Sequence, residues 1–145
     1  MQLETARFIT AYKRGYSPRW ISLLGTSGAG KTMLAKEIWR ICGGRFVTWT
    51  RVANMLREGE YRWFSDLMHE HIVILDDIGS EYATPFIAAK LYEFLSERVG
   101  LWTVITCNLS LADIGNKLDV RIASRMLRGD SRVVDVEVPD FNLRK

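Results

Sequence analysis

One octapeptide constrains this chain more than any other segment: it is Gly25-Thr26-Ser27-Gly28-Ala29-Gly30-Lys31-Thr32. It matches G-x-x-x-x-G-K-[ST] at every fixed position, between a predicted buried strand and a predicted helix. Such glycines let successive backbone N–H groups point at a phosphate, and the N-terminus of the following helix adds partial positive charge. Lys31 then reaches the β- and γ-phosphates, and the Thr32 hydroxyl ligates Mg²⁺. The segment predicts a nucleoside triphosphate site rather than a glycine-rich turn without a ligand.

Along the whole chain, short apolar runs typical of buried strands alternate with segments whose apolar residues recur at helical spacing. Strands are predicted at 20–24, 46–49, 72–75, 101–106 and 132–136. Helices are predicted at 3–14, 32–42, 51–57, 61–69, 85–98 and 117–128. Strands that alternate with helices favour an α/β fold, with a five-stranded parallel sheet and helices on both faces.

The chain has 145 residues, which suits a single domain: a leading helix in 1–19 and a nucleotide-binding core in 20–145. The net charge of +3 divides into +6 for residues 1–45, −4 for 46–100 and +1 for 101–145. Its two cysteines, Cys42 and Cys107, lack metal-ligand spacing and are expected to be reduced core thiols. Because there is no signal peptide and no membrane-spanning run, we expect a cytoplasmic protein without membrane contact.

A second motif is acidic and follows the apolar strand at 72–75. Asp76 lies at the predicted carboxyl end of this strand and is expected to hold the Mg²⁺ shell. Asp77 is placed to polarise the attacking water as a general base. Glu81 is a further candidate carboxylate. The alternative for this segment is a solvated acidic turn.

Two further sets of polar residues come later in the chain. Asn108 ends the strand at 101–106, where it could orient a water beside the γ-phosphate or simply form a turn. Arg121, Arg125 and Arg128 have i, i+4 and i+7 spacing and are predicted to share one helix face, opposite an apolar face. Such a row is commonly solvated, but the planar guanidinium also suits a phosphoryl transition state on a neighbouring subunit.

Together these segments resemble the AAA+ ATPases of the DnaC/DnaI/IstB type, which include helicase loaders and transposition proteins. The motifs that carry the resemblance are GTSGAGKT, ILDDIGSE, TCNLS, RIASRM and the terminal FNLRK. The resemblance implies a P-loop NTPase fold, the AAA+ base domain, here without a separate lid domain. It implies ATP and Mg²⁺ as ligands, and a cytoplasmic protein of a bacterial or phage-infected cell. Loaders of this type usually carry an N-terminal extension that grips the helicase, whereas about 19 residues precede the first predicted strand here.

The resemblance also implies roles for single residues. Lys31 and Thr32 belong to Walker A, Asp76 and Asp77 to Walker B, and Asn108 is sensor 1. Arg125 is the arginine finger that meets the next subunit's ATP, with Arg121 as its partner, and Arg144 matches sensor 2. Such proteins form homo-oligomeric rings or spirals around single-stranded DNA and contact a replicative helicase.

The segment between the second and third strands is where relatives of this type place DNA-contacting helices. It holds Arg51, Arg57, Tyr61, Arg62, Trp63 and Phe64. Arginines interleaved with aromatic rings suit a platform for phosphates and bases. The alternative is that both Trp63 and Phe64 belong to the core and that the arginines are solvated, and the acids of this segment weaken the DNA interpretation.

Four functions remain open on sequence alone. The leading one is an ATP-hydrolysing replication protein of the helicase-loader kind. The others are a transposition helper acting on duplex DNA, a small-molecule P-loop kinase, and a nucleotide-gated binding module with negligible turnover. The kinase interpretation leaves Asn108 and the arginine face without a role. The binding module stays open because Asp77 is one methylene shorter than the Glu of many hydrolysing relatives.

Overall fold

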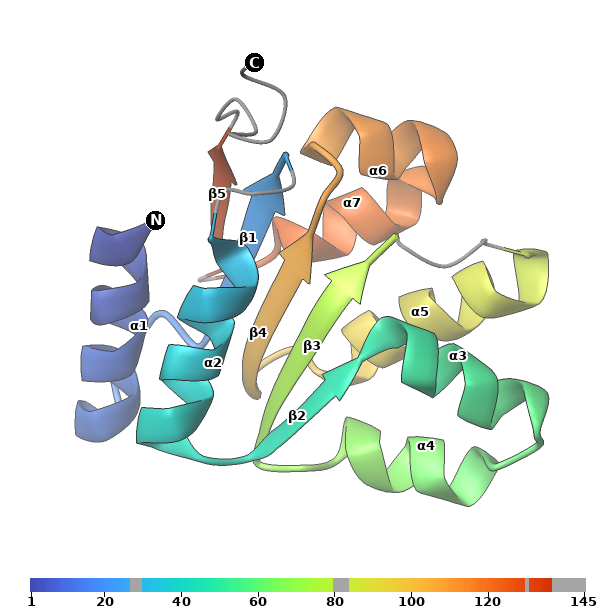
Figure 1. Ribbon diagram of the computed structural model, residues 1–145, viewed down its shortest axis with the longest axis horizontal. Coiled ribbons are helices and arrows are strands. Elements are labelled where there is room, and N and C mark those ends of the chain that lie inside the picture. Colours follow the sequence, from blue (N-terminus) through green and yellow to red (C-terminus); the bar gives the residue numbers. More distant parts are fainter. Residues whose placement is uncertain (27–29, 80–83, 130, 137–145) are drawn as a thin grey trace, which may run out of the picture.

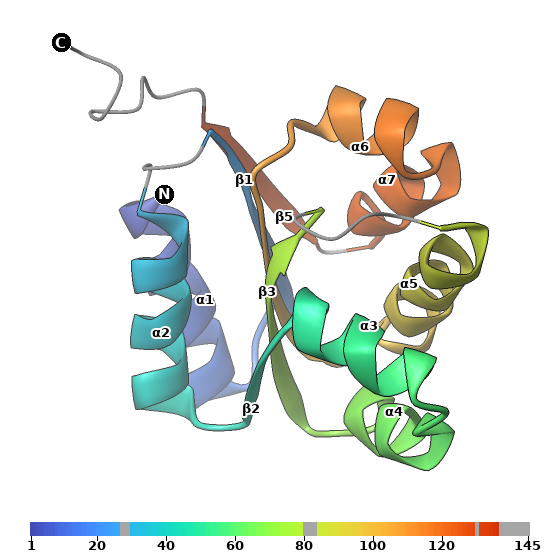
Figure 2. The same cartoon turned by 45° about the vertical axis from the view of Figure 1, so that its right-hand side comes forward.

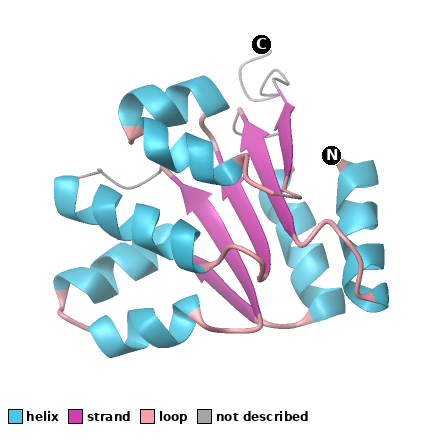
Figure 3. Ribbon diagram, turned by 180° about the vertical axis from the view of Figure 1, so that it is seen from behind, coloured by secondary structure: helices cyan, strands magenta, loops and turns pink. Residues whose placement is uncertain are grey.

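The computed structural model describes residues 1–26, 30–79, 84–129 and 131–136. Its centre is a five-stranded parallel sheet in the order β2-β3-β4-β1-β5. The strands are β1 (Trp20–Gly25), β2 (Arg45–Thr48), β3 (Ile72–Ile78), β4 (Trp102–Cys107) and β5 (Arg132–Val136). All strand arrows point the same way, so their carboxyl ends meet at one edge of the sheet (Figure 1, and from behind in Figure 3). This arrangement confirms the predicted fold class.

Helices cover both faces of the sheet, as Figure 2 shows most clearly. One face carries α1 (Gln2–Arg14) and α2 (Lys31–Cys42). The other carries α3 (Trp49–Arg57), α4 (Tyr61–Met68), α5 (Pro85–Glu97), α6 (Leu111–Lys117) and α7 (Val120–Met126). Each face has its own apolar core, and the central strands β1 and β4 are buried along their whole length. Among the described residues, no helix is both long and apolar enough to cross a membrane.

The largest differences from the predicted elements lie at the starts of α3, α6 and α7, where a capping side chain sets the start of each helix. The sequence predicts Trp49 in a strand, but it begins α3, because the Thr48 side chain accepts a hydrogen bond from the Arg51 backbone at 3.2 Å. The predicted helix at 117–128 is shorter and begins at Val120, after the N-cap Asp119. The preceding α6 is absent from the predicted elements, although its N-cap Ser110 accepts from the Asp113 backbone.

A buried arginine joins three elements at the opposite edge of the sheet. Arg98 follows α5 and is fully buried, and burial lowers its pKa to about 10. Its guanidinium donates to the carbonyl oxygen of Trp102 at 2.6 Å, to that of Met68 at 3.1 Å, and to that of Glu70. Its Nε donates to the Thr103 hydroxyl at 3.2 Å. Arg98 therefore ties the connection between α4 and β3 to the start of β4.

Replacing this arginine should destabilise the whole domain. In Arg98→Met the apolar stem is kept, but three carbonyls, two of them buried, are deprived of their donor, so we expect the free energy of unfolding to fall by about 3 kcal/mol. Urea unfolding followed by circular dichroism measures this change. Arg40→Met is the matched control, because Arg40 is exposed and, among the described residues, its ion pair is with Glu37 on its own helix. Equal urea midpoints for Arg98→Met and the native chain would contradict this account of Arg98.

Candidate functional site

The glycine-rich loop lies between the end of β1 and the start of α2, at the carboxyl edge of the sheet. Gly25 ends β1, and Gly30 caps α2 in the left-handed region at φ 84°, which glycine adopts without strain. Lys31 is only 5% exposed, and its Nζ donates to the Thr26 carbonyl oxygen at 2.6 Å. Three residues predicted to bind phosphate lie outside the described residues: Ser27, Gly28 and Ala29. The same holds for Glu81 and Arg144, so the structure does not test their predicted roles.

Burial and charge act in opposite directions on Lys31. Desolvation lowers its pKa, and the nearby carboxylates of Asp76 and Asp77 partly offset this by favouring the ammonium form. The adjacent Cys107 is a free, buried thiol whose pKa burial raises to about 11, so at neutral pH it adds no charge. The site thus combines one desolvated cation with two acidic neighbours.

The two acids owe their placement to a β-bulge in β3. Leu75 pairs with Ile105 and Ile78 with Cys107, so β3 has one residue more than β4 between these pairs. Asp77 lies in this bulge and has φ 64°, a left-handed backbone conformation that Asp tolerates better than most residues. In a regular strand, consecutive side chains point to opposite faces. The bulge instead lets both carboxylates take part in the same polar network.

A continuous series of hydrogen bonds connects the loop to the ends of β3 and β4. The Thr32 hydroxyl donates to Asp76 Oδ1 at 3.1 Å, and the Thr106 hydroxyl donates to the same oxygen at 2.6 Å. Thr106 in turn accepts from the Asp77 backbone N–H at 2.8 Å. Asn108 Nδ2 donates to Asp77 Oδ1 at 3.2 Å. The structure therefore brings together Thr32, Asp76, Asp77 and Asn108, as expected from the order of parallel strands.

Thr106 joins this network although the sequence patterns do not single it out. Thr106 is 2% exposed. Its hydroxyl donates to the Asp76 carboxylate and accepts from the Asp77 backbone N–H, so it fixes both acidic residues. Its position on β4, one strand away from the acids and two residues before Asn108, is the signal that could have identified it. Buried hydroxyls need a partner, and the neighbouring acids supply it.

An open cavity of about 340 Å³ lies over this network. Its lining residues are Gly30, Lys31, Thr32, Met33, Asp77, Thr106 and Asn108. Within the described part of the chain, no cluster of three or more His, Cys, Asp or Glu could hold a metal by itself. Mg²⁺ does not need one, because it usually binds one or two protein oxygens together with substrate phosphates and water. The adjacent oxygens of Thr32 and Asp76 fit that requirement.

Removing the ammonium of Lys31 should weaken nucleotide binding more than folding. In Lys31→Ala the phosphates lack their desolvated counter-charge, so we expect the Kd for a nucleoside triphosphate to rise about a hundredfold. Titration with a fluorescent nucleotide analogue measures this. Lys36→Ala is the matched control, because Lys36 is an exposed lysine on the same helix. Unchanged affinity in Lys31→Ala, with native folding, would show that the loop does not hold phosphates in this chain.

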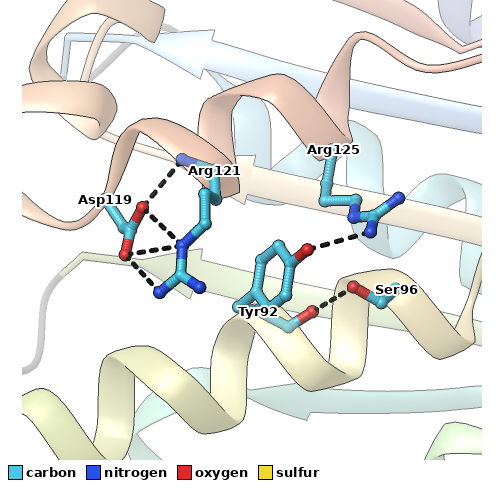
Figure 4. Close-up of polar contacts among 5 residues, drawn as sticks. All are labelled: Tyr92, Ser96, Asp119, Arg121 and Arg125. Atoms are coloured by element: carbon cyan, nitrogen blue, oxygen red, sulfur yellow. Dashed lines mark hydrogen bonds and ion pairs between the residues drawn. The ribbon is translucent and has the colours of Figure 1, made fainter.

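The arginines of α7 lie apart from this cavity and are held by residues of α7 and α5 (Figure 4). Arg121 makes ion-paired hydrogen bonds to Asp119, the N-cap of α7, at 3.0 and 3.2 Å. Arg125 is half-buried and donates to the Tyr92 hydroxyl at 2.9 Å. The predicted apolar face is present, since Ile122 is fully buried. Arg128 does not share the helix face, because α7 ends at Met126.

The predicted DNA platform forms the outer surface of α3 and α4. Its four candidate side chains are all exposed: Arg51, Arg57, Tyr61 and Arg62. Phe64, in contrast, belongs to the core at 2% exposure, and Trp63 is partly buried against that core. The alternative interpretation of these two aromatic residues is thus correct for Phe64 and partly correct for Trp63.

Known structures share this fold at low sequence identity. The DnaC helicase loader is 21% identical, with a TM-score of 0.70, 93% of this chain and 87% of that chain being covered. DnaI is 20% identical, with a TM-score of 0.75 and coverage of 95% and 82%. The replication initiator DnaA bound to AMPPCP and single-stranded DNA is 15% identical, with a TM-score of 0.70, and the match covers 94% of this chain but 45% of that chain. None of the curated proteins matches the sequence significantly.

The sequence itself carries the decisive match. The model of the family described as IstB-like ATP binding protein matches residues 16–138. This range includes the glycine-rich loop, the acidic end of β3, Asn108 and α7. It confirms the resemblance to AAA+ proteins of the DnaC/DnaI/IstB type. The chain belongs to the family of IstB-like ATP binding proteins.

Proposed function

We propose that this chain binds and hydrolyses ATP, and that ATP drives its assembly on DNA in replication, as in helicase loading. The observation that carries the proposal is the hydrogen-bonded series from Thr32 through Asp76 and Thr106 to Asp77 and Asn108. This series ends in one open cavity, whose wall includes Lys31, Asp77 and Asn108, and Asp76 is hydrogen-bonded to Thr32 of the same wall. Neither a solvated acidic turn nor a simple strand end needs this arrangement.

The polar residues in and beside this cavity have distinct roles in the proposed hydrolysis. Lys31 and the loop backbone bind the phosphates, and Thr32 with Asp76 would hold Mg²⁺, which neutralises phosphate charge when bound. Asp77 accepts a proton from the attacking water, while Asn108 donates to Asp77 Oδ1 and fixes the direction of its carboxylate. The left-handed backbone of Asp77 aims this base and is held by Thr106.

A second copy of the chain would complete the site. Among the described residues that line the cavity, Lys31 is the only cation and no arginine is present. Charge that builds up on the phosphoryl group during transfer is commonly stabilised by an additional arginine. Arg125 is half-buried on α7 outside this cavity, so we assign it to the nucleotide of a neighbouring copy. Homo-oligomerisation with ATP follows from this assignment.

We further propose that α3 and α4 contact single-stranded DNA. The exposed arginines of this surface supply phosphate contacts. The guanidinium carbon of Arg51 lies 6.0 Å from the centroid of the Trp63 ring. A solved DnaA structure of the same fold is described as bound to single-stranded DNA. The prediction concerns the double variant Arg57→Ala/Arg62→Ala, because these two side chains are exposed on α3 and α4.

Removing two arginines that neutralise phosphates should lower both the affinity for DNA and its salt dependence. We expect the slope of log K against log salt to become shallower by about 1.4, or about 0.7 for each phosphate no longer neutralised. Fluorescence anisotropy with a labelled oligothymidine at several salt concentrations measures both quantities. Arg7→Ala/Arg40→Ala removes the same charge from exposed side chains of α1 and α2 and serves as the control. An unchanged slope in the Arg57/Arg62 variant would exclude this surface.

The family match also favours a second candidate, a transposition helper that acts on duplex DNA. Co-purification with the host's replicative helicase, with and without ATP and single-stranded DNA, distinguishes the two. Helicase capture and stimulation of turnover by single strands support the loader. Stimulation by duplex DNA without helicase capture supports the helper. Transfer of the γ-phosphate to a small acceptor instead of water would contradict both.

A further inference from the structure

Tyr92 of α5 contacts both arginines of α7, although no sequence motif marks it. The guanidinium carbon of Arg121 lies 4.8 Å from the centroid of the Tyr92 ring, and that of Arg125 lies 5.2 Å from it. The ring lies between the two side chains, and its hydroxyl accepts the hydrogen bond from Arg125 (Figure 4). A cation–π contact and a hydrogen bond together restrict a long side chain more than either contact does alone.

The ring is itself fixed by its helix. Tyr92 follows Leu91 and precedes Phe94 and Leu95, which are at most 1% exposed and anchor α5 in the core. The Tyr92 ring also packs partly against this core. A side chain on such a rigid element can hold another one within the narrow limits that catalysis requires.

The two arginines are held differently. Arg121 uses its Nε and Nη2 on Asp119, so much of its hydrogen-bonding capacity is used within the chain. Within the described residues, Arg125 makes one hydrogen bond, through Nη2 to Tyr92, and its other N–H groups have no protein acceptor. A guanidinium has five donors in a fixed fork. Arg125 therefore combines a fixed position with donors that can still reach an anion.

We propose that Tyr92 is a positioning residue for Arg125, holding its guanidinium ready for the ATP of a neighbouring copy. This inference rests on the proposed function, since it needs a site completed by a second copy. The hydroxyl sets where Nη2 lies, and the ring limits the rotamers of both arginines. Because the side chain is ordered before assembly, the entropy cost of ordering it when the two copies meet is smaller.

Mixing two inactive variants tests the role in the subunit that supplies the arginine. Arg125→Ala is the acceptor, with an intact nucleotide site but no finger. Asp77→Asn is the donor, which keeps Arg125 and binds ATP but lacks the base. Each alone should hydrolyse ATP poorly, and their mixture should regain turnover. The donor is then made as Asp77→Asn/Tyr92→Phe and as Asp77→Asn/Tyr92→Leu.

We expect the regained kcat to fall about tenfold with the Phe donor, and about a hundredfold with the Leu donor, which also lacks the ring. The KM for ATP should not change, because the nucleotide lies on the acceptor. Full recovery with both Tyr92 donors would overturn the positioning role while leaving the split site intact. If even the unmodified donor restores nothing, the split site of the proposed function fails and the role of Tyr92 fails with it.

Two controls separate positioning from damage to the fold. A donor with Tyr16→Phe, an exposed tyrosine after α1, should restore as much turnover as the unmodified donor. Placing Tyr92→Phe in the Arg125→Ala acceptor should also change nothing, because that subunit has no finger to position. If Tyr92→Phe lowers turnover equally in either subunit, Tyr92 acts on general structure and the proposal is wrong. Thermal unfolding of each variant checks that the donors are folded.

Discussion

Arg125→Ala should lower the ATP turnover of the assembled chain by about 10³- to 10⁵-fold while leaving ATP affinity nearly unchanged, which is the effect expected of an arginine finger. The cavity around Lys31 contains no arginine among its described lining residues, so the transition state otherwise lacks this charge. Arg125 is the candidate because it is held by Tyr92 yet keeps donors that can reach a phosphate. Steady-state phosphate release, with ATP and single-stranded DNA saturating, measures the loss.

Arg128→Ala is the matched control for this variant. Arg128 lies three residues further along and is exposed, but it follows the end of α7 and therefore does not extend the helix face. We expect its turnover to stay within about threefold of the native chain, a small fraction of the finger effect. If Arg125→Ala and Arg128→Ala behave alike, α7 does not supply a finger.

Asp77→Asn should produce the second large effect, a fall in kcat of about 10²- to 10⁴-fold, the range attributed to a positioned general base. Asparagine is nearly isosteric, and it also tolerates the left-handed conformation that the bulge imposes at φ 64°. The fold and the hydrogen bond from Thr106 to Asp76 should therefore survive. Phosphate release gives kcat, and titration with a fluorescent ATP analogue gives affinity.

The same variant decides whether the chain is an ATPase or a nucleotide-gated binding module. A module with negligible turnover would lose nothing in Asp77→Asn, so equal low rates in both chains would contradict the proposed hydrolysis. Asp113→Asn provides the control, because it removes one exposed carboxylate from α6 without touching the cavity. Its kcat should match that of the native chain.

Local sequence patterns predict the layers and most of the elements. The apolar run at 72–75 is a strand buried on both faces, and Gly30-Lys31-Thr32 starts a helix at the carboxyl edge of the sheet. Such features depend on burial and spacing within one segment, and these are visible in a single sequence. Parallel strands then bring residues distant in sequence to one edge, so the neighbourhood of Asp76 and Asn108 could also be anticipated.

Features that depend on the detailed pairing of two elements, beyond the order of the strands, could not be predicted. The bulge at Asp77 appears only when β3 is paired with β4, because it is a mismatch between two strands. Thr106 and Tyr92 act through residues 30 and 33 positions away. Arg98 is buried because four carbonyl and hydroxyl oxygens converge on it. Residues of these types are common in strands and helices, so the roles of Thr106, Tyr92 and Arg98 follow only from the tertiary structure.

The proposed function assigns opposite roles to two surfaces of each copy. In this proposal, the cavity lined by Lys31, Asp77 and Asn108 would bind the nucleotide, and Arg125 of α7 would complete the cavity of another copy. A chain built in this way cannot reach full turnover alone, however tightly it binds ATP. Its activity per chain must therefore depend on how many chains have assembled.

The dependence of ATP turnover per chain on chain concentration tests this central claim most directly. The native chain is assayed at saturating Mg²⁺ and ATP, from concentrations at which sedimentation shows monomers to those at which it shows oligomers. We expect turnover per chain to be very low in the monomer and to rise steeply to a plateau as oligomers form. The same turnover per chain across the whole range would contradict a site shared between two copies.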